Sequence, residues 1–154
     1  IYLNARNFRE HPGRRLWARS DDGGESFSTF GVDSALVTPV TPHWTGIVAS
    51  VVRIAGAADS KSRIAYSGPS SNNTRASMTI RVSHDEGRTW STGRVLWPGP
   101  SAYSDLVSLS GAVGIIFENG DVTFADRVSF ARLELDWLEP EGREEAATAA
   151  GDGS

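Results

Sequence analysis

The chain has 154 residues, of which 39% are hydrophobic and 22% are charged, and it contains no cysteine. This length is typical of about one domain of ~100–200 residues. The composition excludes a collagen-like chain, a disulfide scaffold and a wholly disordered protein. No run approaches the ~20 apolar residues that a membrane-spanning helix needs, so we expect no membrane span. Without cysteine, the chain has no disulfide, no thiol nucleophile and no cysteine-ligated zinc.

The net charge of −4 arises in the C-terminal segment. Residues 139–154 carry five acidic side chains and one arginine, which leaves 14 basic and 14 acidic residues in 1–138. Because residues 1–138 carry no net charge, they do not attract nucleic acid or anionic lipid electrostatically, and we expect neither as a partner. The basic residues are 14 arginines and Lys61. Genome composition explains this skew, but arginine is also the side chain that binds a planar carboxylate through two parallel hydrogen bonds.

Short β-strand patterns follow one another along the chain, with Gly, Pro, Asn, Asp or Ser between them. Most show period-two alternation or a β-branched run, which is typical of strands. The predicted strands are 1–6, 15–20, 48–54, 63–67, 77–83, 93–97, 103–109, 113–118, 121–125 and 128–135. No stretch before residue 139 sustains a helical period, so the sequence predicts an all-β fold.

The two ends of the chain differ in character. The sequence opens directly in a strand pattern at Ile1, with no methionine and no charged leader before it, so we expect the C-terminal piece of a longer protein. Residues 139–154 are acidic and rich in alanine, with no apolar face to bury, and we expect them to be disordered. The sequence therefore predicts a β domain, residues 1–138, and a tail, residues 139–154.

One internal repeat indicates the architecture. Ser20–Phe27 and Ser83–Trp90 share the pattern Ser-x-Asp-x-Gly-x-Ser/Thr-aromatic, 63 residues apart. The Asp carboxylate can accept turn amides, Gly takes the positive φ, and we expect the aromatic ring to be buried between neighbouring sheets. The pattern is that of the Asp-box of β-propellers, and two copies at a blade-like interval favour that fold. Strand counting predicts a partial six-bladed β-propeller of about two and a half four-stranded blades.

Four short segments carry the functional interpretation: Asn4–Asn7, Ser67–Arg75, Leu96–Leu106 and Phe117–Gly120. The third reads Leu-Trp-Pro-Gly-Pro-Ser-Ala-Tyr-Ser-Asp-Leu, follows the second Asp-box and is the most specific. At these segments the chain resembles the exo-sialidases (neuraminidases), most closely the animal lysosomal type and its bacterial relatives. The order and spacing of the segments agree with that family from residue 1 to about residue 135.

The resemblance implies roles for four side chains. Arg6 and Arg75 correspond to the second and third arginines that bind the carboxylate of sialic acid, and Tyr103 to the nucleophile. Glu118 corresponds to the residue that orients the first arginine. In relatives that arginine, the aspartate acid/base and the glutamate that activates the tyrosine all lie upstream of the segment that begins here. The resemblance thus implies an exo-α-sialidase that acts with retention and without a cofactor, and an isolated chain that is inactive.

The chemistry of the substrate agrees with that assignment. A sialic acid carries a carboxylate on its anomeric carbon, and converging guanidiniums can fix this group through charge-assisted, bidentate bonds. A carboxylate nucleophile would approach an already negative centre, whereas a neutral phenol avoids this repulsion. The tyrosine of sialidases is a known exception to the two-carboxylate scheme of glycosidases.

Each of these residues also has a purely structural interpretation. Arg6 stands at a strand end, where most arginines are solvated. Tyr103 could be a core aromatic, and Glu118 a turn carboxylate after a hydrophobic strand. Arg81 competes with Arg75 for the third arginine, but its place inside a predicted strand favours a surface or cross-strand charge. We therefore assign Arg75.

Two further features bear on the site. Val48 stands where relatives often carry Gln or Glu, which affects recognition of the sugar's side chain rather than the reaction. His11, His43 and His84 are far apart in predicted turns, so we expect no metal site.

Other functions remain open at this stage. The main alternative is a non-catalytic Asp-box propeller that binds sialylated glycans or a protein partner, and such a protein would be free to lose Tyr103. Another is an Asp-box glycosidase acting on polysaccharides, which would need paired carboxylates in its pocket. The sequence does not separate a hydrolase from a trans-sialidase. Expected partners are sialylated glycoproteins, glycolipids or oligosaccharides, and the resemblance implies a secreted or lysosomal protein.

Overall fold

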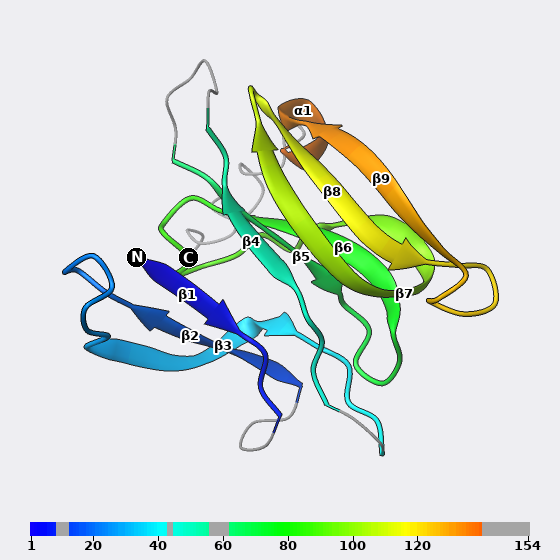
Figure 1. Cartoon of the computed structure of the whole chain (residues 1–154), viewed down its shortest axis with the longest axis horizontal. Helices are drawn as coiled ribbons and strands as arrows, with labels where there is room; N and C mark the ends of the chain where they lie inside the picture. The colour runs from blue at the N-terminus through cyan, green and yellow to red at the C-terminus, as the bar shows by residue number, and fades with distance from the viewer. Residues whose placement is uncertain (9–12, 43–44, 56–61, 140–154) are drawn as a thin grey trace, which may run out of the picture.

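The computed structural model describes residues 1–8, 13–42, 45–55 and 62–139. Within these residues, nine antiparallel strands form two sheets (Figure 1). A short helix, α1 (Leu135–Leu138), follows the last strand. The strands are β1 (Tyr2–Ala5), β2 (Arg14–Arg19), β3 (Thr29–Val37), β4 (Ser50–Arg53), β5 (Ile64–Pro69), β6 (Ala76–Ser83), β7 (Arg94–Leu109), β8 (Ala112–Asn119) and β9 (Arg127–Glu134).

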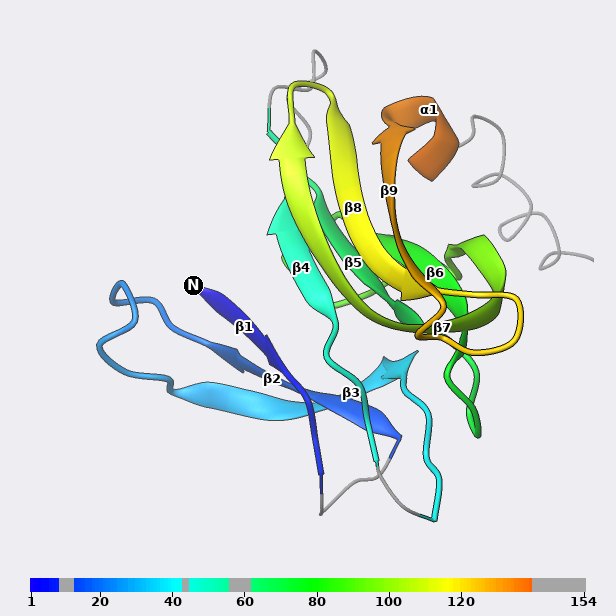
Figure 2. The ribbon, with the colours of Figure 1, turned by 45° about the vertical axis from the view of Figure 1, so that its right-hand side comes forward.

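In both sheets, strands that follow one another in sequence are neighbours in space. The smaller sheet has the order β1-β2-β3, and the larger one β4-β5-β6-β7-β8-β9. The 16-residue strand β7 joins the two halves of the larger sheet, because it pairs first with β6 and then with β8. The larger sheet curls on itself along β7, while the smaller sheet lies beside β4 (Figure 2).

The curl of the larger sheet encloses the core. Its buried side chains come from both halves of the sheet and from α1, and partly buried Trp97 and Trp137 pack against them. Met78 and Ile115 are among the largest side chains that are fully buried. The core residues are Ile54, Ala65, Met78, Ile80, Val82, Leu106, Val113, Ile115, Phe117, Leu133 and Leu138.

The structure differs from the predicted strands in three places. Strand β3 (Thr29–Val37) was not predicted; it contains Gly31, and the Asp33 carboxylate accepts the N–H groups of Ala35 and Leu36, which interrupts the strand pattern. Residues 121–125 are a turn rather than a strand. The predicted strands 93–97 and 103–109 belong to one continuous strand, β7.

The C-terminal boundary also differs slightly from the prediction. Strand β9 ends at Glu134, and the next residue opens α1, a helix that the strand periodicity did not predict. Most of the predicted tail, residues 140–154, lies outside the described residues. The division into a β domain and a disordered tail therefore stays a prediction, as does the number of blades.

The two repeated segments fold into the same hydrogen-bonded turn. In the first, Asp22 accepts the N–H of Ser26 at 3.0 Å, and Ser20 Oγ accepts the N–H of Gly24 at 2.8 Å. In the second, the Asp85 carboxylate accepts the N–H of Thr89 at 2.8 Å, and Ser83 accepts from Gly87 at the same distance. Both glycines have positive φ, 100° and 77°. In both turns the Asp carboxylate accepts a backbone N–H and the Gly has a positive φ, as the repeat predicts.

The two aromatic residues of the repeats behave differently. Trp90 lies between the sheets, with its ring 6.4 Å from that of Tyr2 and 5.9 Å from that of Tyr66. Its Nε1 donates to Asp33 on β3 at 3.0 Å, which ties the two sheets together. Phe27 is 39% exposed, so the prediction of a buried ring is wrong there. The described residues place no second sheet against it.

Candidate functional site

The segment before β6 and the strand β7 hold two of the predicted site residues side by side. Ser101, two residues before Tyr103, donates its backbone N–H to the carbonyl of Arg75 at 2.9 Å. The pairing of β6 with β7 shifts on both sides of Met78, and Ser77 has a positive φ of 64°. A non-glycine residue in that conformation is uncommon and tends to occur where surrounding structure fixes a functional backbone.

The side chains of Arg75 and Tyr103 are in contact. The guanidinium carbon of Arg75 lies 5.3 Å from the centroid of the Tyr103 ring, within the range of a cation–π interaction. The same carbon lies 4.8 Å from the centroid of the Phe124 ring. Arg81 is placed elsewhere, since its Nη1 donates to the carbonyl of Ser91 at 2.7 Å. This geometry agrees with the choice of Arg75 over Arg81.

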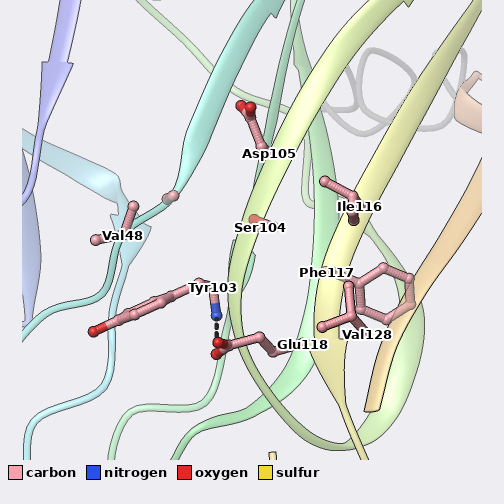
Figure 3. A pocket seen from close by; sticks show the side chains of 9 residues that line it. Val48, Tyr103, Ser104, Asp105, Ile116, Phe117, Glu118 and Val128 are labelled. Atoms are coloured by element: carbon pink, nitrogen blue, oxygen red, sulfur yellow. Dashed lines mark hydrogen bonds between the residues drawn. The ribbon is translucent and has the colours of Figure 1, made fainter. Parts of the chain in front are cut away.

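Glu118 lies beneath the main chain of Tyr103. The backbone N–H of Tyr103 donates to Glu118 Oε2 at 3.2 Å, across an irregular part of the β7–β8 pairing (Figure 3). The Tyr103 ring, 37% exposed, extends towards Val48, and its hydroxyl points away from Glu118 (Figure 3). The structure therefore brings Arg75, Tyr103 and Glu118 together where β7 passes from pairing with β6 to pairing with β8.

A cavity of about 430 Å³ opens beside Tyr103. Most of its wall is apolar, and the carboxylates that reach it are Glu118 and Asp105. Asp105 is engaged in tying β4 to β7, because it accepts a hydrogen bond from Ser50 Oγ at 2.7 Å. The lining residues are Val48, Ala49, Tyr103, Ser104, Asp105, Ile116, Phe117, Glu118 and Val128.

Arg6 stands apart from this cavity. It follows β1 on the smaller sheet, and its Nε and Nη2 both donate to the carbonyl of Thr45, at 3.1 and 2.9 Å. Its guanidinium carbon also lies 4.1 Å from the centroid of the Phe8 ring. Among the described residues, Arg6 does not line the cavity. Arg75 does not line it either, although it contacts the Tyr103 ring, and the role of Arg6 stays a prediction.

Sequence reasoning missed a buried arginine that supports the site. Arg15 is only 3% exposed, and its Nη1 donates to the carbonyl of Ile47 at 2.7 Å, next to Val48. Its Nε donates to the side chain of Asn4, so it joins β1 to the segment that lines the cavity. Burial lowers the pKa of Arg15 from its usual value. Local periodicity carried no signal for it, because the alternation of this strand places Arg15 and Arg19 on the face opposite to Leu16 and Ala18.

Burial raises the pKa of Tyr66, between the two sheets, to about 12, so this phenol is neutral at physiological pH. The described part of the chain contains no group of three His, Cys, Asp or Glu side chains arranged for a metal ion. No helix among the described residues is both long enough and apolar enough to cross a membrane.

Comparison with known proteins places the chain in a family. Residues 1–116 match the family model described as the BNR repeat-like domain. A sialidase of Micromonospora viridifaciens is 33% identical over 144 residues, which are 90% of this chain and 20% of that protein. The chain therefore belongs to the BNR repeat-like family and has sialidases among its relatives. It spans about a fifth of the length of that sialidase.

Solved structures of sialidases have the same fold. The NanB sialidase of Streptococcus pneumoniae matches 90% of this chain with a TM-score of 0.72 and 20% identity, over 22% of its own length. The leech intramolecular trans-sialidase, in complex with 2,7-anhydro-Neu5Ac, matches 89% with a TM-score of 0.67 and 23% identity, also over 22% of its own length. The predicted resemblance to sialidases and the all-β, propeller-type fold are thereby confirmed.

Proposed function

We propose that the chain is part of an exo-α-sialidase, a glycoside hydrolase that removes terminal sialic acids with retention. The observation that carries the proposal is the contact between Arg75 and Tyr103, 5.3 Å from guanidinium carbon to ring centroid. A cation that can bind a carboxylate therefore stands beside a phenol that can act as a nucleophile. The relationship to the Micromonospora sialidase over 90% of the chain supports the same reading.

In the proposed reaction, Arg75 and Arg6 bind the sialic acid carboxylate, with Arg6 turning from the carbonyl of Thr45 towards the sugar. The guanidinium fork matches a carboxylate, so it fixes the position of the anomeric carbon. The Tyr103 oxygen, after losing its proton to a base, attacks that carbon and forms a bond as the glycosidic oxygen leaves with a proton from an acid. Water then replaces the tyrosine, and two displacements give net retention.

Glu118 has a positioning role in this proposal. Its carboxylate accepts the Tyr103 backbone N–H, and we assign its free oxygen to another arginine of the carboxylate site. Neither Glu118 nor Asp105 lies at the phenolic oxygen (Figure 3). The base and the acid are therefore assigned to parts of the protein beyond these residues, and the isolated chain should be inactive. Sialylated glycoproteins, glycolipids or oligosaccharides are the proposed substrates.

The test is hydrolysis of a fluorogenic sialoside by the protein expressed from its complete reading frame. We expect release of the fluorophore, and proton NMR of the first-formed product should show the α-anomer of the free sugar. A first product with the β-anomer would contradict a tyrosine-linked intermediate. A protein that binds N-acetylneuraminate without hydrolysing sialosides would instead be a binding propeller.

A further inference from the structure

The β8–β9 loop, residues 120–126, brings a second aromatic partner to Arg75. The centroid of the Phe124 ring lies 4.8 Å from the guanidinium carbon of Arg75, closer than the Tyr103 ring at 5.3 Å. Phe124 is half-buried, although residues 121–123, 125 and 126 of the same loop are exposed. An aromatic ring that turns from an exposed loop onto a cation contributes a specific contact rather than general core packing.

The loop holds Phe124 in one place through an unusual concentration of hydrogen bonds. A single oxygen of Asp126, Oδ2, accepts the backbone N–H groups of Asp121, Val122 and Thr123, at 3.0, 2.9 and 3.1 Å. Its Oδ1 accepts the Thr123 hydroxyl at 2.7 Å. These four bonds fix the backbone on the N-terminal side of Phe124. The ring is therefore presented by a rigid support.

The loop is also tied directly to the strand that carries Tyr103. Gly120 donates its N–H to the carbonyl of Pro100 at 3.1 Å, and a Cβ at Gly120 would overlap the carbonyl oxygen of Thr123. Pro100 is paired with Ala76, the residue after Arg75. The loop, β7 and the start of β6 thus form one continuous backbone frame around the guanidinium.

We propose that Phe124 is a positioning residue that, together with Tyr103, restrains the guanidinium of Arg75 for in-plane binding of the sialic acid carboxylate. This inference rests on the proposed function. An aromatic face contacts the flat π surface of a guanidinium, whereas a carboxylate binds along its N–H edge. Two ring contacts therefore limit rotation of the Arg75 guanidinium. If Arg75 is already restrained before binding, less conformational entropy is lost when the substrate binds.

The proposal predicts a particular kinetic pattern in the protein from the complete reading frame. Replacing Phe124 by Leu keeps an apolar side chain but removes the aromatic face, and KM for a fluorogenic sialoside should rise by about two- to tenfold. The turnover number should change by less than about twofold, because the lost restraint affects bound substrate and transition state alike. Phe124→Trp, which keeps an aromatic face, should restore KM.

One control variant and one stability measurement separate a positioning role of Phe124 from an effect on loop folding. Val122→Ala changes a side chain that is 84% exposed in the same loop, and it should leave both constants unchanged. Melting temperatures of all variants should agree with the parent, so that a change in KM reflects the site. Equal KM values for the parent, Phe124→Leu and Phe124→Trp would overturn the positioning role and leave the sialidase function intact. A parent protein that neither hydrolyses the sialoside nor binds N-acetylneuraminate would overturn the proposed function itself.

Discussion

Arg75 and Tyr103 are in cation–π contact, with 5.3 Å between guanidinium carbon and ring centroid, although 27 residues separate them in the sequence. The backbone bond from Ser101 to Arg75 sets the alignment of the two residues. Strand pairing, rather than a local sequence motif, thus places the guanidinium of Arg75 beside the proposed nucleophile Tyr103. The predictions below follow from this arrangement.

The first prediction concerns the choice between two arginines. Arg75→Lys keeps a positive charge but loses the planar fork, so KM for a sialoside should rise by about 10- to 100-fold, the cost of a hydrogen bond to a charged group. Arg81→Lys is the matched control, because Arg81 donates to the carbonyl of Ser91 and does not face Tyr103. Steady-state kinetics of both variants check this. A larger effect at Arg81 than at Arg75 would contradict the assignment.

The second prediction concerns acid stability. Hydrogen bonds from the backbone of Val122 and the side chain of Thr123 lower the pKa of Asp126 to about 2, from its usual 3.8. Because the pKa is lower in the folded protein, the carboxylate stabilises the fold above pH ~4, and this contribution disappears as the pH falls from about 4 to 2. Asp85 behaves similarly: burial opposes the shift, but hydrogen bonds from Thr89 and Ser83 outweigh it and hold its pKa at about 2.

Thermal unfolding as a function of pH measures these contributions. Asp126→Asn should flatten the loss of stability between pH 4 and 2 relative to the parent, and it should have little effect on the slope between pH 6 and 8. If Asp126→Asn loses stability between pH 4 and 2 as steeply as the parent does, this carboxylate does not hold the loop. Glu25→Gln is a suitable control, since it removes an exposed carboxylate from the first turn.

The third prediction tests the connection between the two sheets. Trp90→Phe removes the donor to Asp33, and it should lower the free energy of unfolding by about 1–3 kcal/mol. Trp97→Phe is the matched control, because Trp97 Nε1 is buried and makes no hydrogen bond among the described residues. Denaturant titration of both variants gives the comparison. An equal loss in the two variants would mean that ring volume, rather than the Asp33 bond, joins the sheets.

The fourth prediction concerns the 154-residue chain in isolation. The face of β7–β9 that carries Tyr103 exposes Val107, Ile116, Val128 and Phe130 by 50 to 66%, and Ile116 and Val128 also line the cavity. The strands β4 and β9 are open edges of the larger sheet. Exposed apolar faces and open edges promote association, so we expect the isolated chain to aggregate or to fold poorly. A monomer that melts cooperatively in analytical ultracentrifugation and calorimetry would contradict this expectation.

A point substitution can locate that association. Phe130→Lys places a charge on the exposed face of β9, and it should reduce the aggregated fraction. Val122→Lys adds the same charge to an exposed loop position outside this face and should have a smaller effect. Equal effects of the two substitutions would point to net charge rather than to the apolar face.

The sequence predicted most strands because period-two alternation reflects a half-buried surface, as in the second half of β7 and in β9. It did not predict β3, where Asp33 accepts the indole N–H of Trp90, a half-buried residue between β6 and β7. Local periodicity cannot reveal a partner so distant in the sequence. It also misjudged residues 121–125, because one carboxylate, Asp126, organises that loop.

The candidate site shows the same division. A family resemblance located Tyr103, Arg75 and Glu118, and the structure places Arg75 and Glu118 in contact with Tyr103. The contact from Phe124 could not be predicted, because it depends on how a loop folds back over a distant strand. Arg6 was predicted from the same resemblance, yet it donates to the carbonyl of Thr45.

Replacing Tyr103 by Phe tests the central claim most directly, because it removes one oxygen and keeps the ring that contacts Arg75. The protein from the complete reading frame and its Tyr103→Phe variant should be compared on one fluorogenic sialoside. We predict that the variant loses activity by about 10³-fold or more while still binding N-acetylneuraminate, as expected when a nucleophile is removed. Full activity in the variant would contradict the assignment of Tyr103 as the nucleophile.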